Sequence, residues 1–324
     1  MPSRTLVREL TPGTKVDFIL NVREATLGTT KNGSQFVRAT LADKSGTIKA
    51  NKWDADESVL AQFPQGAYVR VRGTVESFRG QNQLKIEQVR PADESEVDPS
   101  DFQATTERDM GALRKELKRL VKSIQNPHLS ELLNRIFVTD KGLLERFCRA
   151  PAAHQYHHAY LGGLLEHSIC MATGAEAVAA ANDRLDRDLL VAGALLHDIG
   201  KIDELSSDVG FDKTDAGQMV GHIVLGTILL HDIINSLGQF PNDLRLELMH
   251  LILSHHGSRE YGSPVVPATA EAIALHHLDN LDAKVQAADA AIHQPVPEGA
   301  KWTEFVRMLE TRVYRGHLLE EEEG

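Results

Sequence analysis

Short stretches in which apolar and polar residues alternate fill the first 92 residues of the chain. Five of them lie at residues 16–22, 36–41, 47–53, 68–75 and 84–89, separated by turn-forming segments such as 31–34 and 43–46. Alternation with a period of two is typical of strands that bury one face. The pattern predicts a small closed barrel of five strands.

The period changes after residue 105. From there to residue 318 apolar residues recur three or four positions apart, as Leu113, Leu117 and Leu120 do. This spacing predicts helices, and no stretch there predicts a strand convincingly. Between the two regions, residues 91–101 hold two prolines and five acidic residues, a composition that predicts a linker. We expect a barrel over 1–92, an acidic linker over 93–104, an all-helical domain over 105–319 and an acidic tail over 320–324.

Charge is divided unevenly between these regions. The net charge of the 324 residues is −11, but residues 1–92 carry 14 Lys and Arg against 9 Asp and Glu, and the remainder carries 21 against 37. A mildly basic barrel on an acidic body permits a polyanionic ligand at one end only. Two cysteines, Cys148 and Cys170, exclude a disulfide framework and favour a reducing compartment. With neither a signal peptide nor an apolar run of about 18 residues, we expect a cytoplasmic protein without membrane contact.

The predicted barrel resembles a nucleic-acid-binding OB-fold. The resemblance is carried by the turn at residues 43–46, by Trp53 and Asp54 at the end of the third strand, and by residues 69–75. Such folds bind single strands across their second and third strands. The residues expected to hold the strand are Phe36, Arg38, Lys49, Trp53 and Arg79. In the alternative interpretation, Phe36 and Trp53 close the barrel ends and the charges are solvated surface.

The stretch Leu195-Leu196-His197-Asp198-Ile199-Gly200-Lys201 ends an apolar segment with an imidazole beside a carboxylate. Burying such a pair is costly unless both groups are paired or bind a metal. Further histidines and an aspartate stand near expected helix ends, which makes seven candidate ligands: His167, His197, Asp198, His222, His255, His256 and Asp279. Nitrogen and oxygen ligands without thiolates suit divalent Mn, Fe, Co, Zn or Ni, with Mg as a further candidate.

The order of these residues resembles the HD superfamily of metal-dependent phosphohydrolases, which is all-α. Its pattern of His, His-Asp and Asp matches His167, His197, Asp198 and Asp279, and the other three histidines match members that hold two ions. Asp282, three residues further on, is the alternative last ligand. Trinuclear relatives have a Glu where this chain has Gly163, so a third ion is not expected. The further histidines favour two ions, and the choice between one ion and two stays open.

The same resemblance implies a mechanism. Asp198 would bridge the two ions, and a water between them would become the attacking hydroxide. Lys201 could neutralise charge that develops on the phosphate, or it could instead pair with a helix dipole. A second Leu-Leu-His-Asp-Ile string at residues 229–233 lies in mid-helix, and we interpret its His231 and Asp232 as structural.

Barrel and helical domain together resemble the YhaM-type 3′→5′ exoribonuclease family over nearly the whole chain. The most specific segments are residues 156–167 and 279–284. The resemblance implies that the barrel holds single-stranded RNA, or single-stranded DNA, while the HD site removes nucleotides from the 3′ end, with Mn as the expected ion. His157, His158 and Asp282 become candidate substrate contacts, although the two histidines could equally steady the first metal-binding helix.

Two other functions fit the sequence. The HD site could hydrolyse nucleotides or cyclic dinucleotides, with the barrel as a protein-interaction domain, or the chain could be a nucleic-acid-binding factor whose metal is structural. The preference for RNA or DNA, the identity of the metal and the oligomeric state stay open, since the apolar stretches at 225–230 and 246–253 could serve an interface as well as a core.

Overall fold

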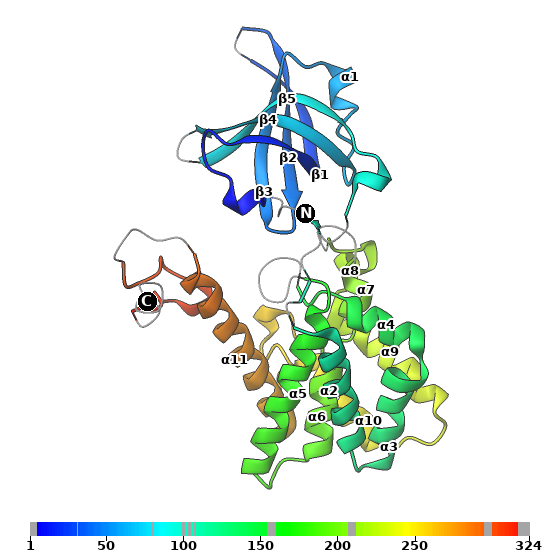
Figure 1. The fold of residues 1–324 in the computed structure, drawn as a ribbon. Helices are drawn as coiled ribbons and strands as arrows, with labels where there is room; N and C mark the ends of the chain where they lie inside the picture. The colour runs from blue at the N-terminus through cyan, green and yellow to red at the C-terminus, as the bar shows by residue number, and fades with distance from the viewer. Residues whose placement is uncertain are drawn as a thin grey trace. The chain divides into compact units, whose positions relative to one another are not determined.

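A computed structural model describes residues 5–30, 32–78, 81–98, 101–102, 105–106, 108–153, 160–206, 212–294 and 300–316. The chain divides into two compact units, one built mainly from residues 1–105 and the other mainly from the remainder (Figure 1). Each unit has its own hydrophobic core.

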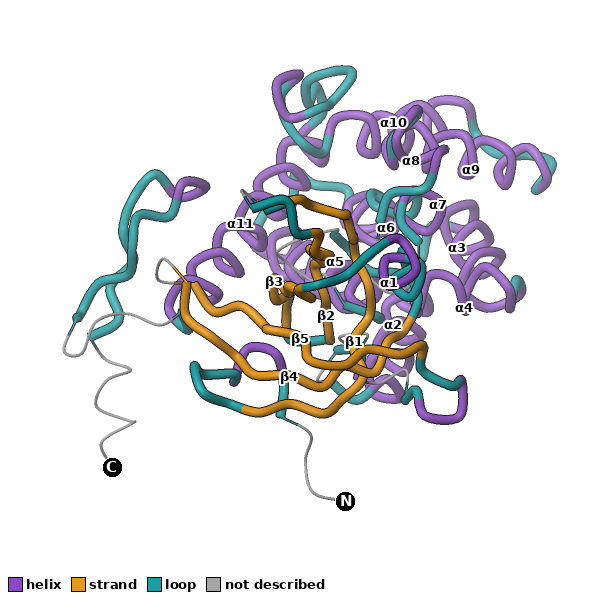
Figure 2. Tube along the Cα trace, turned by 90° about the horizontal axis from the view of Figure 1, so that it is seen from above, coloured by secondary structure: helices purple, strands orange, loops and turns teal. Residues whose placement is uncertain are grey.

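The first unit is the predicted five-stranded barrel. Its strands are β1 (Lys15–Thr29), β2 (Gln35–Asp43), β3 (Gly46–Trp53), β4 (Tyr68–Phe78) and β5 (Gln81–Pro91). They close in the order β1-β2-β3-β5-β4 around one axis, as Figure 2 shows, with β3 and β5 parallel and the other pairs antiparallel. The long β1 pairs with both β2 and β4. The order and the single parallel pair confirm the OB-fold.

Alternating side chains fill the barrel, which explains the period of two in the sequence. Leu20, Leu41, Val71 and Leu84 have no exposed surface. β4 and β5 come close together at a bulge beside Gly73, where a β-carbon would lie 2.1 Å from the Lys85 carbonyl oxygen. Only glycine fits there, so this residue sets the close contact that shuts the barrel. A short helix, α1 (Glu57–Leu60), lies between β3 and β4 and is capped by Asp56.

Part of the predicted linker packs on the barrel. Residues Glu94–Glu96 form a 3₁₀ turn, and the Glu96 carboxylate pairs with Arg70 at 3.0 Å and Arg90 at 2.7 Å. Phe102 is buried with its ring centroid 4.7 Å from that of Tyr68. These contacts tie the acidic segment to the unit that precedes it.

The second unit is helical, as predicted. Its main helices are α2 (Met110–Ser123), α3 (Pro127–Asn134), α4 (Lys141–Arg149), α5 (Gly163–Ala181), α6 (Arg187–Leu196), α9 (His222–Ser236), α10 (Asn242–Ser254) and α11 (Ala270–Ile292), with the short α7 (Lys201–Glu204) and α8 (Asp215–Met219). α6 is the centre: residues 189–196 are all buried, and α3, α5, α10 and α11 pack against it. Its continuous apolar sequence is therefore that of a core helix.

The last described residues depart from the helical prediction. Residues 300–316 form a small hairpin in which Trp302 bridges to Tyr314 and Val306 to Thr311, with a 3₁₀ turn at Arg307–Leu309 near its tip. Extending the helices to residue 318 was wrong. The sequence carries Pro295, Pro297 and Gly299 just after α11, and such residues end a helix.

No helix in the described ranges is long and apolar enough to cross a membrane.

Candidate metal centre

Five helices bring the seven candidate ligands to one place. His167 lies in the first turns of α5, His197 and Asp198 follow α6, His222 opens α9, His255 and His256 follow α10, and Asp279 lies on α11. Gly200 makes this convergence possible, because a β-carbon there would lie 2.0 Å from the His222 carbonyl oxygen. The backbone after Asp198 can therefore touch the start of α9 and set His222 beside that carboxylate.

Asp198 lies at the middle of the cluster with one oxygen directed to each side. Its Oδ2 is 3.6 Å from His167 Nε2 and 3.5 Å from His197 Nε2. Its Oδ1 is 3.4 Å from His222 Nε2 and 3.5 Å from His255 Nε2. A carboxylate in this position can bridge two cations.

The remaining ligand atoms sort into two sets of three. One contains His167, His197 and Asp279, and the other contains His222, His255 and His256; within each set the atoms lie within 4.8 Å of one another. All seven residues singled out in the sequence thus come together. Two nitrogen-rich sets around a shared carboxylate suit two divalent ions of the borderline class.

Each imidazole is oriented by a hydrogen bond on its far nitrogen. The Nδ1 atoms of His197, His255 and His256 donate to the carbonyl oxygens of Ala194, Ile252 and Tyr261 at 2.7–2.9 Å. Nδ1 of His167 faces Asp282 at 2.9 Å, and Nδ1 of His222 faces Glu204 at 2.9 Å. Such partners fix the tautomer that leaves Nε2 free to bind a metal.

This orientation gives one predicted residue a different place and adds another. Asp282, the alternative last ligand, lies behind His167, and Asp279 supplies the carboxylate of its set. Asp282 also lines the cavity, so its part as a substrate contact stays a prediction. Glu204 was missed, because no motif marks it: α7 brings it under His222 only through the turn at Gly200.

Burial makes the cluster expensive without a cation. The side chains of His197 and Asp198 are 0% and 2% exposed. Asp198 Oδ1 and His222 Nε2 are buried and have no hydrogen-bond partner among the described residues, an arrangement that costs about 1–3 kcal/mol per group. The two atoms lie 3.4 Å apart. The residues present therefore fit a divalent-metal centre.

The charges of the cluster favour the metal-binding protonation states of Asp198 and His197, but not that of His167. Burial would raise the pKa of the Asp198 carboxyl, but Lys201 and the surrounding histidines hold it well below its ordinary value. Burial lowers the pKa of His197 to about 3, so this imidazole is neutral at pH 7. Burial also acts to lower the pKa of His167, but Asp279 and Asp282 outweigh it and raise that pKa to about 9. A cation would reverse that preference, since a metal-bound imidazole carries no proton on the binding nitrogen.

Lys201 lies on the Asp198 carboxylate, where its Nζ donates to Oδ2. It is the first residue of α7, and its side chain is 17% exposed toward the cavity that opens on the cluster. Lys201 is therefore paired with the Asp198 side chain rather than with a helix dipole. The duplicated pair His231 and Asp232, by contrast, is exposed on α9.

Of the residues predicted to form the nucleic-acid face of the barrel, the structure describes Phe36, Arg38, Lys49 and Trp53. Phe36 pairs across the strands with Trp53, their ring centroids are 4.9 Å apart, and the Arg38 guanidinium lies 5.5 Å from the Phe36 ring. Trp53 is 41% exposed, whereas Phe36 is 8% exposed because its ring lies over Gly28. Trp53 therefore offers the accessible ring, and Phe36 supports it from below.

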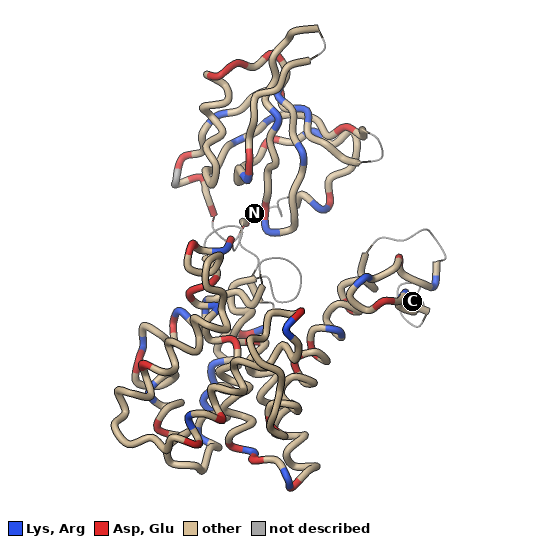
Figure 3. The backbone as a smooth tube through the Cα atoms, turned by 180° about the vertical axis from the view of Figure 1, so that it is seen from behind, with Lys and Arg blue, Asp and Glu red and all other residues tan. Residues whose placement is uncertain are grey.

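Lys49 is further along this face and already has partners. Its ammonium group lies 3.1 Å from Glu24 Oε1 and 2.8 Å from Thr40 Oγ1. Arg79 lies outside the described residues, as do His157 and His158. Figure 3 shows Lys and Arg spread over the barrel strands, with acidic residues among them.

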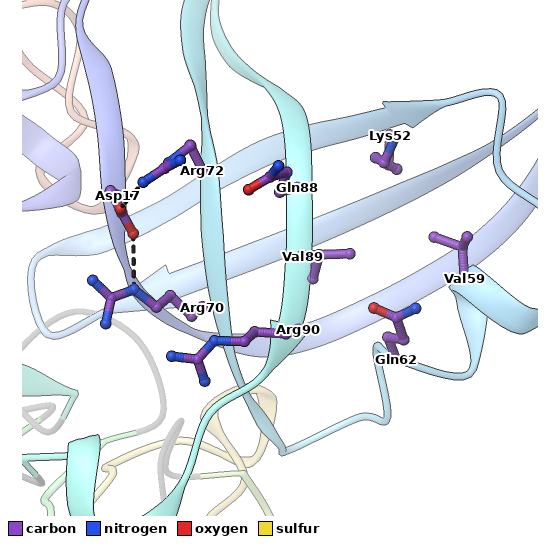
Figure 4. A pocket seen from close by; sticks show the side chains of 9 residues that line it. All are labelled: Asp17, Lys52, Val59, Gln62, Arg70, Arg72, Gln88, Val89 and Arg90. Carbon is purple, nitrogen blue, oxygen red and sulfur yellow. Dashed lines mark hydrogen bonds and ion pairs between the residues drawn. The ribbon is translucent and has the colours of Figure 1, made fainter.

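The structure adds a basic groove that the sequence did not indicate. Arg70, Arg72, Arg90 and Lys52 line a groove of about 540 Å³ on the β4–β5 side of the barrel. Asp17 accepts from both Arg70 and Arg72, at 2.8 and 2.9 Å, as Figure 4 shows. Glu96 forms ion pairs with Arg70 and Arg90, so most of the positive charge of this groove is already paired within the chain.

Comparison with known proteins agrees with both units. The family described as "HD domain" matches residues 164–284, and the one described as "OB-fold nucleic acid binding domain" matches residues 18–92. The "3'-5' exoribonuclease YhaM" of Bacillus subtilis (strain 168) is 37% identical over 303 residues, which span 93% of this chain and 95% of that protein. The protein of the same name from Bacillus licheniformis is 36% identical over 305 residues, with the same coverage of both chains.

The chain belongs to the YhaM-type 3′-5′ exoribonuclease family. Membership is carried by both halves, since the match spans the barrel and the helical unit. Among solved structures, the second OB-fold domain of replication protein A from Methanococcus maripaludis is 20% identical, with a TM-score of 0.23 over 29% of this chain and 98% of that one, a likeness too small to build on. An HD domain in a YhaM-type protein implies dependence on a divalent metal, in keeping with the two ligand sets.

Removing the carboxylate behind His222 tests the orienting role of Glu204 in this YhaM-type centre. We expect Glu204→Gln to lower metal affinity or activity by roughly 10–100-fold, the usual cost of losing such a partner. Metal titration followed by nuclease rate measures the loss. Glu247→Gln, at an exposed glutamate of α10, is the matched control. Equal metal affinity in both variants would show that Glu204 does not orient the ligand.

Proposed function

We propose that this protein is a metal-dependent 3′→5′ exoribonuclease that hydrolyses the phosphodiester bonds of single-stranded RNA. The observation that carries the proposal is Asp198 with two three-residue ligand sets on either side, at the end of a large open cavity. We propose His167, His197, Asp279, His222, His255 and His256 as the further ligands and manganese as the ion. Divalent ions in such a site polarise phosphate oxygens and acidify water.

The chain's own residues prepare the site for this chemistry. Asp198 presents one oxygen to each ligand set, so a single buried carboxylate fixes their separation. Asp282 and Glu204 hold two imidazoles with Nε2 inward. Little rearrangement of side chains is needed to place a phosphate between the sets, and preorganisation of this kind is a main source of catalytic power.

Lys201 is the proposed catalytic cation. Its ammonium group donates to buried Asp198, and the same side chain lines the cavity. There it would stabilise the negative charge that accumulates on the phosphate as the bond to the leaving nucleotide breaks.

The size of the cavity favours a polymer over a small nucleotide. It encloses about 1560 Å³, whereas sites for small molecules commonly measure about 300–1,000 Å³. A mononucleotide or cyclic dinucleotide would leave most of it unfilled. The barrel, with Trp53 and Arg38 on its outer face, would capture the strand that feeds this cavity.

The barrel's role is tested at Trp53. Stacking on an aromatic ring contributes about 1–3 kcal/mol per base, so Trp53→Ala should weaken single-strand binding by about fivefold or more. Trp53→Phe keeps a ring and should retain most of the affinity. Fluorescence anisotropy with labelled single-stranded RNA and DNA at one salt concentration measures both. Leu246→Ala, at an exposed site of α10, is the control. Affinity unaltered by Trp53→Ala would place binding elsewhere on the chain.

The proposed activity predicts a specific pattern of products. Single-stranded RNA labelled at its 5′ end should give a ladder that shortens from the 3′ end in Mn²⁺ and no products after chelation. The same oligonucleotide in DNA sets the RNA-to-DNA preference. Absence of a ladder, together with rapid hydrolysis of a cyclic dinucleotide, would overturn the proposal and favour a small-nucleotide phosphodiesterase.

A further inference from the structure

The cavity at the metal cluster continues well beyond it. At one end it is lined by Lys201, His256 and Asp279, and at the other by residues 303–310 of the C-terminal hairpin. Backbone hydrogen bonds join the two arms of the hairpin: Val306 N donates to Thr311 O at 2.8 Å, and Thr303 N donates to Val313 O at 3.0 Å. Its 3₁₀ turn packs against α11. The far wall of the cavity is therefore a closed hairpin lying on a helix.

The floor between the two ends is formed by α11. Ala283, Ala287, Ala290 and Ala291 line the cavity there, together with Asn280, Asp282 and Lys284. At about 1.5 Å per residue, the helix from Asp279 to Ala291 is about 18 Å long. Bases stacked at about 3.4 Å would occupy that length with roughly five nucleotides. The four alanines leave room for them over much of that length.

Two exposed aromatic rings face this space. Tyr261 is 72% exposed and lies at the metal end, since its carbonyl oxygen accepts from His256 Nδ1. Phe305 is 61% exposed and lies on the hairpin at the far end. Exposed rings cost hydration free energy unless a ligand covers them. A row of bases would cover both.

Charge on the far wall does not select for phosphate. Arg307 of the hairpin and Lys284 of α11 line the cavity, but so do Glu304 and Glu310 of the hairpin. These positive and negative charges largely offset each other. A strand would therefore be held there by the Phe305 ring more than by electrostatic attraction. Stacking is also the mode that tolerates any base.

From these contacts we infer that the cavity is an extended binding site for the last nucleotides of the strand. Tyr261 stacks beside the scissile phosphate, and Phe305 stacks on a base several nucleotides upstream. This inference rests on the proposed exonuclease activity and assigns it a second set of strand contacts, separate from the barrel. It predicts that substrates too short to reach Phe305 are processed less efficiently.

The test compares a uridine dinucleotide with a uridine hexamer in Mn²⁺, by release of UMP. The Trp53→Ala background is used throughout, so that the barrel contributes little. Phe305→Ala should lower the ratio of kcat/KM for the hexamer to that for the dinucleotide by about fivefold or more, mainly through KM. Phe305→Tyr should restore the ratio, and Arg312→Ala, on an exposed part of the same hairpin that does not line the cavity, should match the parent.

Tyr261 gives a complementary result. Tyr261→Ala should lower kcat/KM for both substrates by a similar factor, because even a dinucleotide reaches the metal end. A ratio in Phe305→Ala equal to that of the parent, or a loss of the same size with Arg312→Ala, would overturn the extended site while leaving the exonuclease activity standing. Release of no UMP from either substrate by the unmodified chain would instead overturn the proposed function, and this inference with it.

Discussion

Asp198→Asn is expected to reduce release of nucleotides by at least about a thousandfold while single-strand binding by the barrel changes little. The expected loss exceeds the roughly 10–100-fold cost of removing an outer partner, because the Asp198 carboxylate faces both ligand sets. An amide offers a weaker ligand and cannot bridge through two anionic oxygens. Nuclease rate and anisotropy on the same preparations measure the two effects.

The chain contains its own control for this substitution. Asp232 stands in the same Leu-Leu-His-Asp-Ile sequence as Asp198 but is exposed on α9. Asp232→Asn should keep full activity. Because Asp198→Asn leaves Lys201 without its partner, the melting temperature of the variant is measured beside its rate, to check that the loss does not come from misfolding. Substantial activity in Asp198→Asn would remove Asp198 from the centre of the mechanism.

Removal of divalent ions is expected to lower the melting temperature of the helical unit as well as to stop hydrolysis. An ion present at about 100 times its Kd stabilises the folded state by about 2.7 kcal/mol. For a domain of about 200 residues each kcal/mol corresponds to about 2–4 °C, so chelation should lower Tm by about 5–10 °C. The physical source is the repulsion and lost hydration of the buried cluster once no cation balances it.

Calorimetry with and without chelator measures this shift, and re-addition of Mn²⁺ should reverse it. The variant His222→Ala with His255→Ala, which removes one ligand set, should show a smaller shift. A Tm that is the same in chelator and in Mn²⁺ would mean that the cluster holds no tightly bound ion.

The sequence was most informative where periodicity and residue order carry the structure. Alternation at residues 36–41 and 47–53 predicts β2 and β3 because each strand buries one side inside the barrel. The ligands could be found because each lies at a helix end or on a helix facing the centre, so their order along the chain follows the order of the helices.

What the sequence could not give depends on contacts between distant segments. Glu204 lies behind His222 only because Gly200 lets two backbones touch. Phe36 is buried because its ring packs over Gly28 on a neighbouring strand. Arg70, Arg72 and Arg90 gather around Asp17 and Glu96 through strand pairing and a docked linker. The C-terminal hairpin, held by a few hydrogen bonds, has no periodic signature at all.

Anomalous diffraction from crystals grown with Mn²⁺ tests the binuclear centre most directly. The structure predicts two peaks on opposite sides of Asp198, one beside His167, His197 and Asp279 and the other beside His222, His255 and His256. A single peak, or peaks remote from Asp198, would contradict it.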